Sequence, residues 1–152
     1  MAKADLERFR AAQLRNLEAM NRRDLDTAFS WVPEGFEWYP LPELVPHIDV
    51  VTAALKGPEE IREFFDRIVA EWDWHASARE FRDPGDGTLV VRLEGHGVGR
   101  TTELEMQIHF RQIWEFEASD EDGSPARPVR VRETVEGTRL PGIALRDVDT
   151  DD

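Results

Sequence analysis

The alternation of residues 103–117 is the feature that most constrains the fold of this chain. One side of this stretch carries Leu104, Met106, Ile108, Phe110, Gln112, Trp114 and Phe116. The opposite side is mostly charged and carries Glu103, Glu105, Gln107, His109, Arg111, Ile113, Glu115 and Glu117. A period of two with one apolar face predicts a long antiparallel strand that covers a core on one side.

Other stretches also have strand patterns. Residues 75–82 are followed by the turn Asp83–Gly87, and the next strand runs through Leu89, Val91 and Leu93. A last strand carries Val129, Val131, Glu133 and Val135 on one face. Residues 36–39 form a short strand that ends at Pro40, because proline cannot continue a ladder.

Three helices precede the long strands. Residues 4–21 have an amphipathic pattern, and Asp24 is a suitable N-cap for a short helix through residue 30. Residues 57–72 begin with Gly, Pro and two glutamates and then repeat apolar residues at helical spacing. Helices followed by hairpin-connected strands predict an α+β fold: a cone-shaped, curved antiparallel sheet with three N-terminal helices enclosing a pocket.

Length and charge narrow the class of protein. The chain has 152 residues, and 19 Lys and Arg against 32 Asp and Glu give a net charge of −13. This charge disfavours nucleic acid and anionic membranes as partners. The absence of cysteine excludes disulfides and thiolate sites, and no apolar segment is long enough for a membrane span. We expect a cytoplasmic protein with one domain over residues 1–137 and a partly disordered acidic tail over 138–152.

The element order and two motifs resemble the nuclear transport factor two-like superfamily, which has a cystatin-like cone fold. These motifs are residues 57–65 (GPEEIREFF) and 21–26 (NRRDLD). Residues 97–105 (GVGRTTELE) and 129–133 (VRVRE) resemble the SnoaL-like polyketide cyclase group. The resemblance implies an isomerase, cyclase, dehydratase, epoxide hydrolase or binding module. It also implies a homodimer through the outer sheet face.

The ketosteroid isomerases of this superfamily use an aspartate base that faces a tyrosine and a protonated aspartate. By this resemblance the base position falls on Tyr39, the tyrosine on Asn16 and the second aspartate on Gln112. All three positions stay polar, but none carries a carboxylate. The resemblance therefore implies a polar pocket in which that isomerase mechanism lacks its base.

Glu133 is the candidate for proton transfer. It lies between Val131 and Val135 on the apolar face of the last strand, where burial would raise its pKa toward the range that a general acid or base needs. Two structural alternatives remain open: a neighbouring arginine pairs with Glu133, or a bulge turns its side chain outward.

The remaining site candidates describe a mostly apolar cavity. Tyr39 and Gln112 are expected to steady an oxyanion, and Trp38 shares the cavity with Tyr39 only if a bulge intervenes. The other predicted ligand-binding residues are Asn16, with Gln13 beside it, His47, Phe110 and Trp114. Neutral polar anchors around one carboxylate suit a planar or polycyclic organic ligand.

The residues 47–49 (HID) also match part of an iron triad, but the histidines His96 and His109 lie on polar strand faces. We therefore expect no metal and place His47 at the pocket mouth. The basic residues Arg130 and Arg132 are expected to pair with glutamates of the neighbouring strand.

The favoured function is a cofactor-free acid–base enzyme acting on a small hydrophobic carbonyl compound. The alternatives are a non-catalytic ligand-binding or dimerisation module, and iron-dependent oxygenation through His47 and Asp49.

Overall fold

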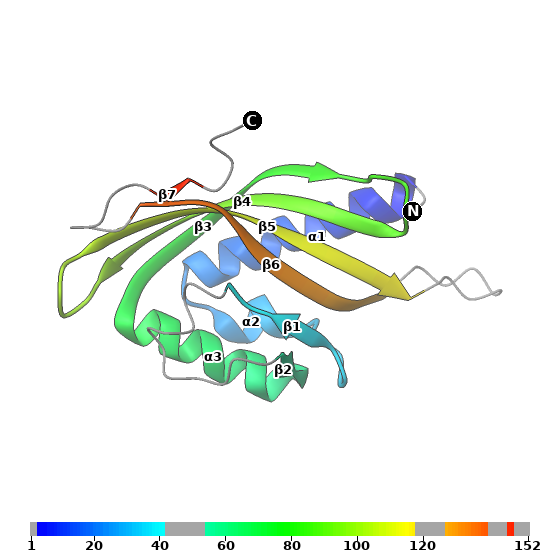
Figure 1. Ribbon diagram of the computed structural model, residues 1–152. Helices are drawn as coiled ribbons and strands as arrows, with labels where there is room; N and C mark the ends of the chain where they lie inside the picture. Colours follow the sequence, from blue (N-terminus) through cyan, green and yellow to red (C-terminus); the bar gives the residue numbers. More distant parts are fainter. Residues whose placement is uncertain (1–2, 42–53, 118–126, 140–145, 148–152) are drawn as a thin grey trace.

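The computed structural model describes residues 3–41, 54–117, 127–139 and 146–147 (Figure 1). The helices are α1 (Lys3–Asn21), α2 (Leu25–Phe29) and α3 (Gly57–Glu71). The strands are β1 (Glu37–Tyr39), β2 (Leu55–Lys56), β3 (Trp72–Arg82), β4 (Thr88–Gly99), β5 (Glu105–Glu117), β6 (Arg127–Arg139) and β7 (Arg146–Asp147). The predicted α+β class with three helices before the long strands is confirmed.

The described strands form one curled sheet in the order β2-β1-β6-β5-β4-β3, and β7 pairs with β6. Neighbours among β3, β4, β5 and β6 are antiparallel. β1 differs from the prediction, because it runs parallel to β6, with Trp38 opposite Val131. A parallel pair needs a long connection, and the described chain between β1 and β6 contains α3 and four strands, β2 to β5.

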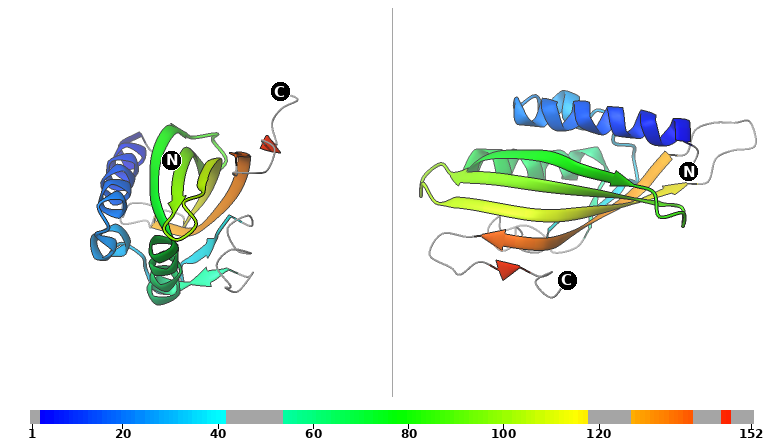
Figure 2. Two further views of the ribbon diagram at one scale, coloured as in Figure 1. Left: turned by 90° about the vertical axis from the view of Figure 1, so that its left-hand side faces the viewer. Right: turned by 90° about the horizontal axis from the view of Figure 1, so that it is seen from above.

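Figure 2 shows how the helices meet the sheet: α1 runs beside β3, and α3 lies across the open side of the curl. α3 begins at Gly57, which has a φ of +76°, and Pro58 follows in its first turn. The apolar face of α3 buries Ile61, Phe64 and Ile68 toward the sheet interior. This arrangement directs the inner sheet face and the helices toward a common core.

Trp114 of β5 lies at the centre of this core and is fully buried. Its ring contacts those of Phe9, Trp31, Phe36 and Trp38, with centroid distances of 5.0, 5.5, 5.9 and 6.3 Å. Aromatic pairs at such distances add to the stabilisation from burial. They join α1, the segment after α2 and β1 to the long sheet.

Two predicted inner-face residues are exposed. Leu104 precedes β5 rather than opening it, and its side chain is 47% exposed. Val129 is 40% exposed because a β-bulge pairs Glu115 with Arg130 and Phe116 with Pro128, which leaves Val129 unpaired. The alternation of apolar and polar residues in the sequence continues through both positions. The regular strand pairing that would turn these two side chains inward does not extend to them.

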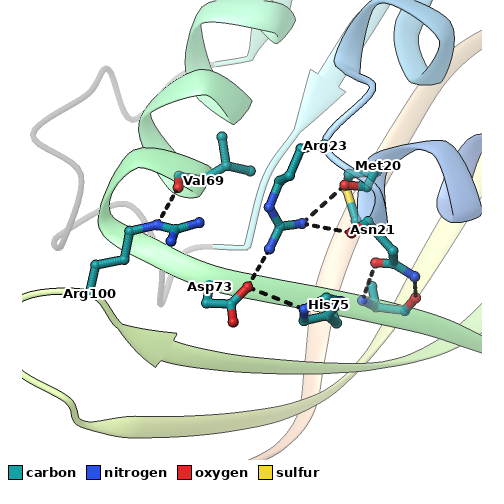
Figure 3. Close-up of polar contacts among 8 residues, drawn as sticks. Met20, Asn21, Arg23, Val69, Asp73, His75 and Arg100 are labelled. Atoms are coloured by element: carbon teal, nitrogen blue, oxygen red, sulfur yellow. Dashed lines mark hydrogen bonds and ion pairs between the residues drawn. The ribbon is translucent and has the colours of Figure 1, made fainter.

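Polar contacts fasten α1 and α3 to the end of the sheet (Figure 3). The Asn21 side chain donates to the carbonyl of Ala76 at 2.9 Å and accepts from its N–H at 3.0 Å. Arg23 donates to Asp73 at 2.7 Å, and Arg100 donates to the carbonyl of Val69 at 2.8 Å. These contacts hold the helices in register with the sheet at the end of the pocket.

Candidate functional site

A pocket lies between the inner face of the sheet and all three helices. Its aromatic lining consists of Phe29, Trp31, Trp38, Phe64, Phe65, Trp74 and Phe110. Its polar lining consists of Gln13, Asn16, Gln112 and Glu133. The space between these side chains is about 640 Å³ including its opening to solvent. A space of this size between aromatic walls suits a small, flat ligand.

Glu133 lies where the sequence predicted it, on the inner face of β6, and is 9% exposed. Its partners among the described residues are neutral: the Gln112 amide donates to its Oε2 at 2.9 Å, and the Trp38 indole N–H and the Leu41 backbone N–H lie close enough to lower its pKa. Burial raises the pKa of Glu133 to about 7, and these hydrogen bonds only partly oppose that rise. Glu133 is thus a buried carboxyl that changes its charge near neutral pH.

Gln112 is held between Glu133 and Trp114. The indole Nε1 of Trp114 donates to the Gln112 Oε1 at 3.1 Å, and the Gln112 Nε2 donates to Glu133. Trp114 itself does not line the pocket, contrary to the prediction, because it lies beneath it in the core. The carbonyl of Gln112 is therefore occupied, and its amide nitrogen faces the carboxylate.

Tyr39 does not face the pocket. β1 continues without a bulge in its pairing with β6, so Trp38 points inward and Tyr39 points to the outer face. The Tyr39 hydroxyl donates to Glu37 at 3.3 Å, and the Arg132 guanidinium lies 4.9 Å from the centre of its ring. The prediction that Tyr39 lines the pocket and steadies an oxyanion there is wrong.

The indole N–H of Trp38 is the unusual polar group of the pocket. The Trp38 side chain is 5% exposed, and its Nε1 is buried without a hydrogen-bond acceptor. It lies close enough to Glu133 to lower the pKa of that carboxyl, but without normal hydrogen-bond geometry.

The structure places other predicted residues as follows. Asn16 and Phe110 line the pocket, with Gln13 one turn away from Asn16 on α1. His47 and Asp49 lie outside the described residues. Among the residues that are described, no three His, Asp or Glu side chains form a group that would hold a metal ion.

Trp74 is a pocket residue that the sequence analysis did not identify. β3 and β4 pair Trp74 with Gly97 and Ala76 with Gly95, and the Trp74 ring lies over both glycines. A Cβ atom at Gly95 would lie 2.3 Å from that ring. The sequence did contain a signal for this contact, namely the glycines at alternate positions 95 and 97. Glycine within a strand often marks a place where another group approaches the backbone closely.

We predict that Gly95→Ala lowers the free energy of unfolding by about 1–3 kcal/mol, because the methyl group displaces the Trp74 ring. Urea unfolding measures this change. Gly97→Ala is the matched control with a smaller expected loss, since its Cβ would lie 3.1 Å from the same ring. Equal losses in both variants would contradict the proposed contact.

The outer sheet face carries ion pairs. Arg130 contacts Glu37 at 3.0 Å and Glu115 at 3.3 Å, and Arg132 lies 3.7 Å from Glu115. The hydrogen bond from Arg130 lowers the pKa of Glu37. The predicted pairing of the arginines with a glutamate of β5 is confirmed. The homodimer through this face stays a prediction.

Comparisons with known proteins identify structural relatives only. No protein-family model matches the chain, and no curated protein matches its sequence. No helix in the described part of the chain is both long and apolar enough to cross a membrane.

The first of three similar solved structures is the hexachlorocyclohexane dehydrochlorinase LinA-type3 from Novosphingobium barchaimii, with a TM-score of 0.67 and 17% identity over 93% of this chain and 97% of that one. An NTF2-like protein of unknown function from Burkholderia pseudomallei has a TM-score of 0.63 and 18% identity, over 88% and 90%. The third is the Mycobacterium tuberculosis protein RV0760c in complex with estradiol-17beta-hemisuccinate, with a TM-score of 0.60 and 12% identity, over 81% and 89%.

These similarities cover nearly all of each chain, and they agree with the curled sheet and the three helices described above. The chain therefore has the nuclear transport factor two-like (NTF2-like) fold.

Proposed function

We propose that the pocket binds a small, flat, hydrophobic carbonyl compound and that Glu133 transfers a proton to and from it, as in a SnoaL-like acid–base enzyme. The observation that carries this proposal is a carboxyl with a pKa of about 7 at the surface of an aromatic pocket. A general acid or base is most effective when its pKa lies near the working pH. The proposal requires no cofactor.

The chemistry follows from the position of one carboxylate among apolar walls. Ionised Glu133 takes a proton from a carbon next to the carbonyl: the C–H bond breaks and a carboxyl O–H bond forms, the C–H electron pair becomes a C=C bond, and the carbonyl π pair moves to the oxygen. Return of the proton to the same carbon, or to another one, completes an exchange or an isomerisation. Ring closure and elimination can begin with the same proton removal.

Two of the structural relatives support this class of ligand and reaction. A dehydrochlorinase removes a proton and chloride from its substrate, and RV0760c was crystallised with an estradiol derivative. Both ligands are hydrophobic ring compounds. The aromatic walls of the present pocket favour a ligand of one or two rings.

Proton exchange on 2-indanone tests the proposal, because this ketone is flat, bicyclic and readily enolised. We expect the protein in D₂O to accelerate replacement of the α-hydrogens by deuterium, followed by ¹H NMR. The value of kcat/KM should rise with pH and level off above about pH 7, since only ionised Glu133 accepts the proton. Exchange at the buffer rate at all pH values, for 2-indanone and a panel of similar ketones, would contradict the proposal.

A binding module is the second candidate function. The position of Tyr39 outside the pocket favours it, because the described lining then contains one ionisable side chain, Glu133, and no phenol. A pure binding protein would be stabilised by a ligand in a thermal-shift experiment and would leave that ligand chemically unchanged. The exchange assay on the same ligand separates the two functions.

A further inference from the structure

The Trp38 indole differs from the two other pocket-region indoles whose hydrogen bonds are known. The Nε1 of Trp31 donates to the Ala28 carbonyl at 2.9 Å, and that of Trp114 donates to Gln112 at 3.1 Å. The Nε1 of Trp38 is buried and makes no hydrogen bond of normal geometry, although it lies close to the Glu133 carboxyl and its side chain lines the pocket. Leaving a buried donor unpaired costs stability, so such a group points to a partner that binds there.

The position of Trp38 next to Glu133 follows from strand pairing. Trp38 lies opposite Val131 in the parallel pair of β1 with β6, and Glu133 is the next inward-facing residue of β6. The pocket therefore presents a hydrogen-bond donor and a carboxylate side by side. An indole N–H donates only, so its partner must be an acceptor atom.

We propose that the Trp38 N–H binds a carbonyl oxygen of the ligand while Glu133 faces the adjacent carbon. The ligand class is then a neutral, enolisable ketone or aldehyde attached to a flat ring system. The catalytic part of this inference rests on the proposed function, but the binding part does not. A neutral ligand is favoured because ionised Glu133 and the apolar walls both oppose an anion in the pocket.

In the reaction, Trp38 keeps its proton. When Glu133 removes the α-hydrogen, the former C–H electron pair forms a C=C bond and the carbonyl π pair moves to the oxygen. The Trp38 N–H stabilises the negative charge that develops on that oxygen, as an oxyanion donor does. Return of the proton from Glu133 restores the ketone.

Binding of a matched ligand pair tests this inference independently of turnover. Wild-type protein should bind 2-indanone more tightly than indane, which has the same rings without the oxygen, in NMR titrations at pH 8. Trp38→Phe should weaken 2-indanone binding about tenfold and leave indane within about twofold. Trp72→Phe is the control, because Trp72 does not line the pocket, and it should leave the ketone-to-hydrocarbon preference unchanged.

The outcomes separate the two proposals. If the protein binds the ketone selectively through Trp38 but does not exchange its protons, the role of Trp38 as a hydrogen-bond donor is supported and the proposed enzymatic function is contradicted. An equal loss for both ligands in Trp38→Phe, or no preference for 2-indanone in the wild type, would overturn the donor. If the Trp38 N–H interacts only with the Glu133 carboxylate, Trp38→Phe would leave the affinity for the ketone unchanged. The pH dependence of proton exchange would instead move to higher pH, and this result would also overturn the donor.

A second measurement needs no Trp38 variant. In ¹⁵N-labelled protein, the five indole N–H resonances are assigned from Phe variants of the other four tryptophans. The Trp38 indole proton should move downfield when 2-indanone binds and not when indane binds. The inference would be overturned if 2-indanone binds and changes the chemical shifts of other indole protons but leaves that of the Trp38 indole proton unchanged.

Discussion

Glu133→Gln abolishes proton exchange on 2-indanone, with an expected loss of at least about a hundredfold in kcat/KM, while the protein stays folded. The physical reason is that glutamine has nearly the same shape and accepts the hydrogen bond from Gln112, but cannot take a proton. General acid–base groups contribute about 10²–10⁴ to the rate. Deuterium incorporation by ¹H NMR measures the loss, and circular dichroism checks the fold.

Glu136→Gln is the matched control for this prediction. Glu136 is also a buried glutamate of β6, but Arg92 donates to its two oxygens at 3.1 and 2.7 Å on the outer face. It does not line the pocket. Exchange should continue in Glu136→Gln at close to the wild-type rate. Retained exchange in Glu133→Gln would assign the reaction to another group.

The second large effect concerns stability against pH. The pKa of Glu133 is about 7 in the folded protein, against 4.5 for an unperturbed glutamate. Between these values the folded state holds a proton that the unfolded state has released, so the contribution of Glu133 to the free energy of unfolding falls as pH rises. The fall is on the order of 3 kcal/mol, at about 1.4 kcal/mol per pKa unit, and is complete above about pH 7.

Glu133→Gln removes this dependence because glutamine does not titrate. The free energy of unfolding of the variant minus that of the wild type should therefore increase by about 3 kcal/mol from pH 4.5 to pH 8. Urea unfolding of both proteins at several pH values measures the difference, in which the contributions of all other carboxylates cancel. A constant difference would show that the folded carboxyl titrates like one in water.

Much of the fold was predictable because its signals are local. A period of two in residues 105–117 and a helical period in 57–71 depend only on neighbouring side chains, and the structure confirms both elements. The same alternation places Gln112 and Glu133 on inner faces. The raised pKa of Glu133 follows from that placement, because burial is its largest cause.

The bulges and the orientation of β1 were not predictable from local pattern. Val129 and Glu136 stand at irregularities in the pairing of β5 with β6, which depend on contacts between distant parts of the chain. The side on which Trp38 and Tyr39 point depends in the same way on the parallel pairing of β1 with β6.

By itself, the sequence determined the succession of helices and strands and the presence of one acidic side chain on an apolar strand face, since both follow from the spacing of residues along the chain. Only the tertiary structure decided which groups surround that acid. Closure of the sheet brings Trp114, Gln112 and Glu133 into one hydrogen-bonded series and leaves the Trp38 N–H unpaired beside it. These contacts are set by register between strands far apart in the chain, and register depends on how the whole core packs.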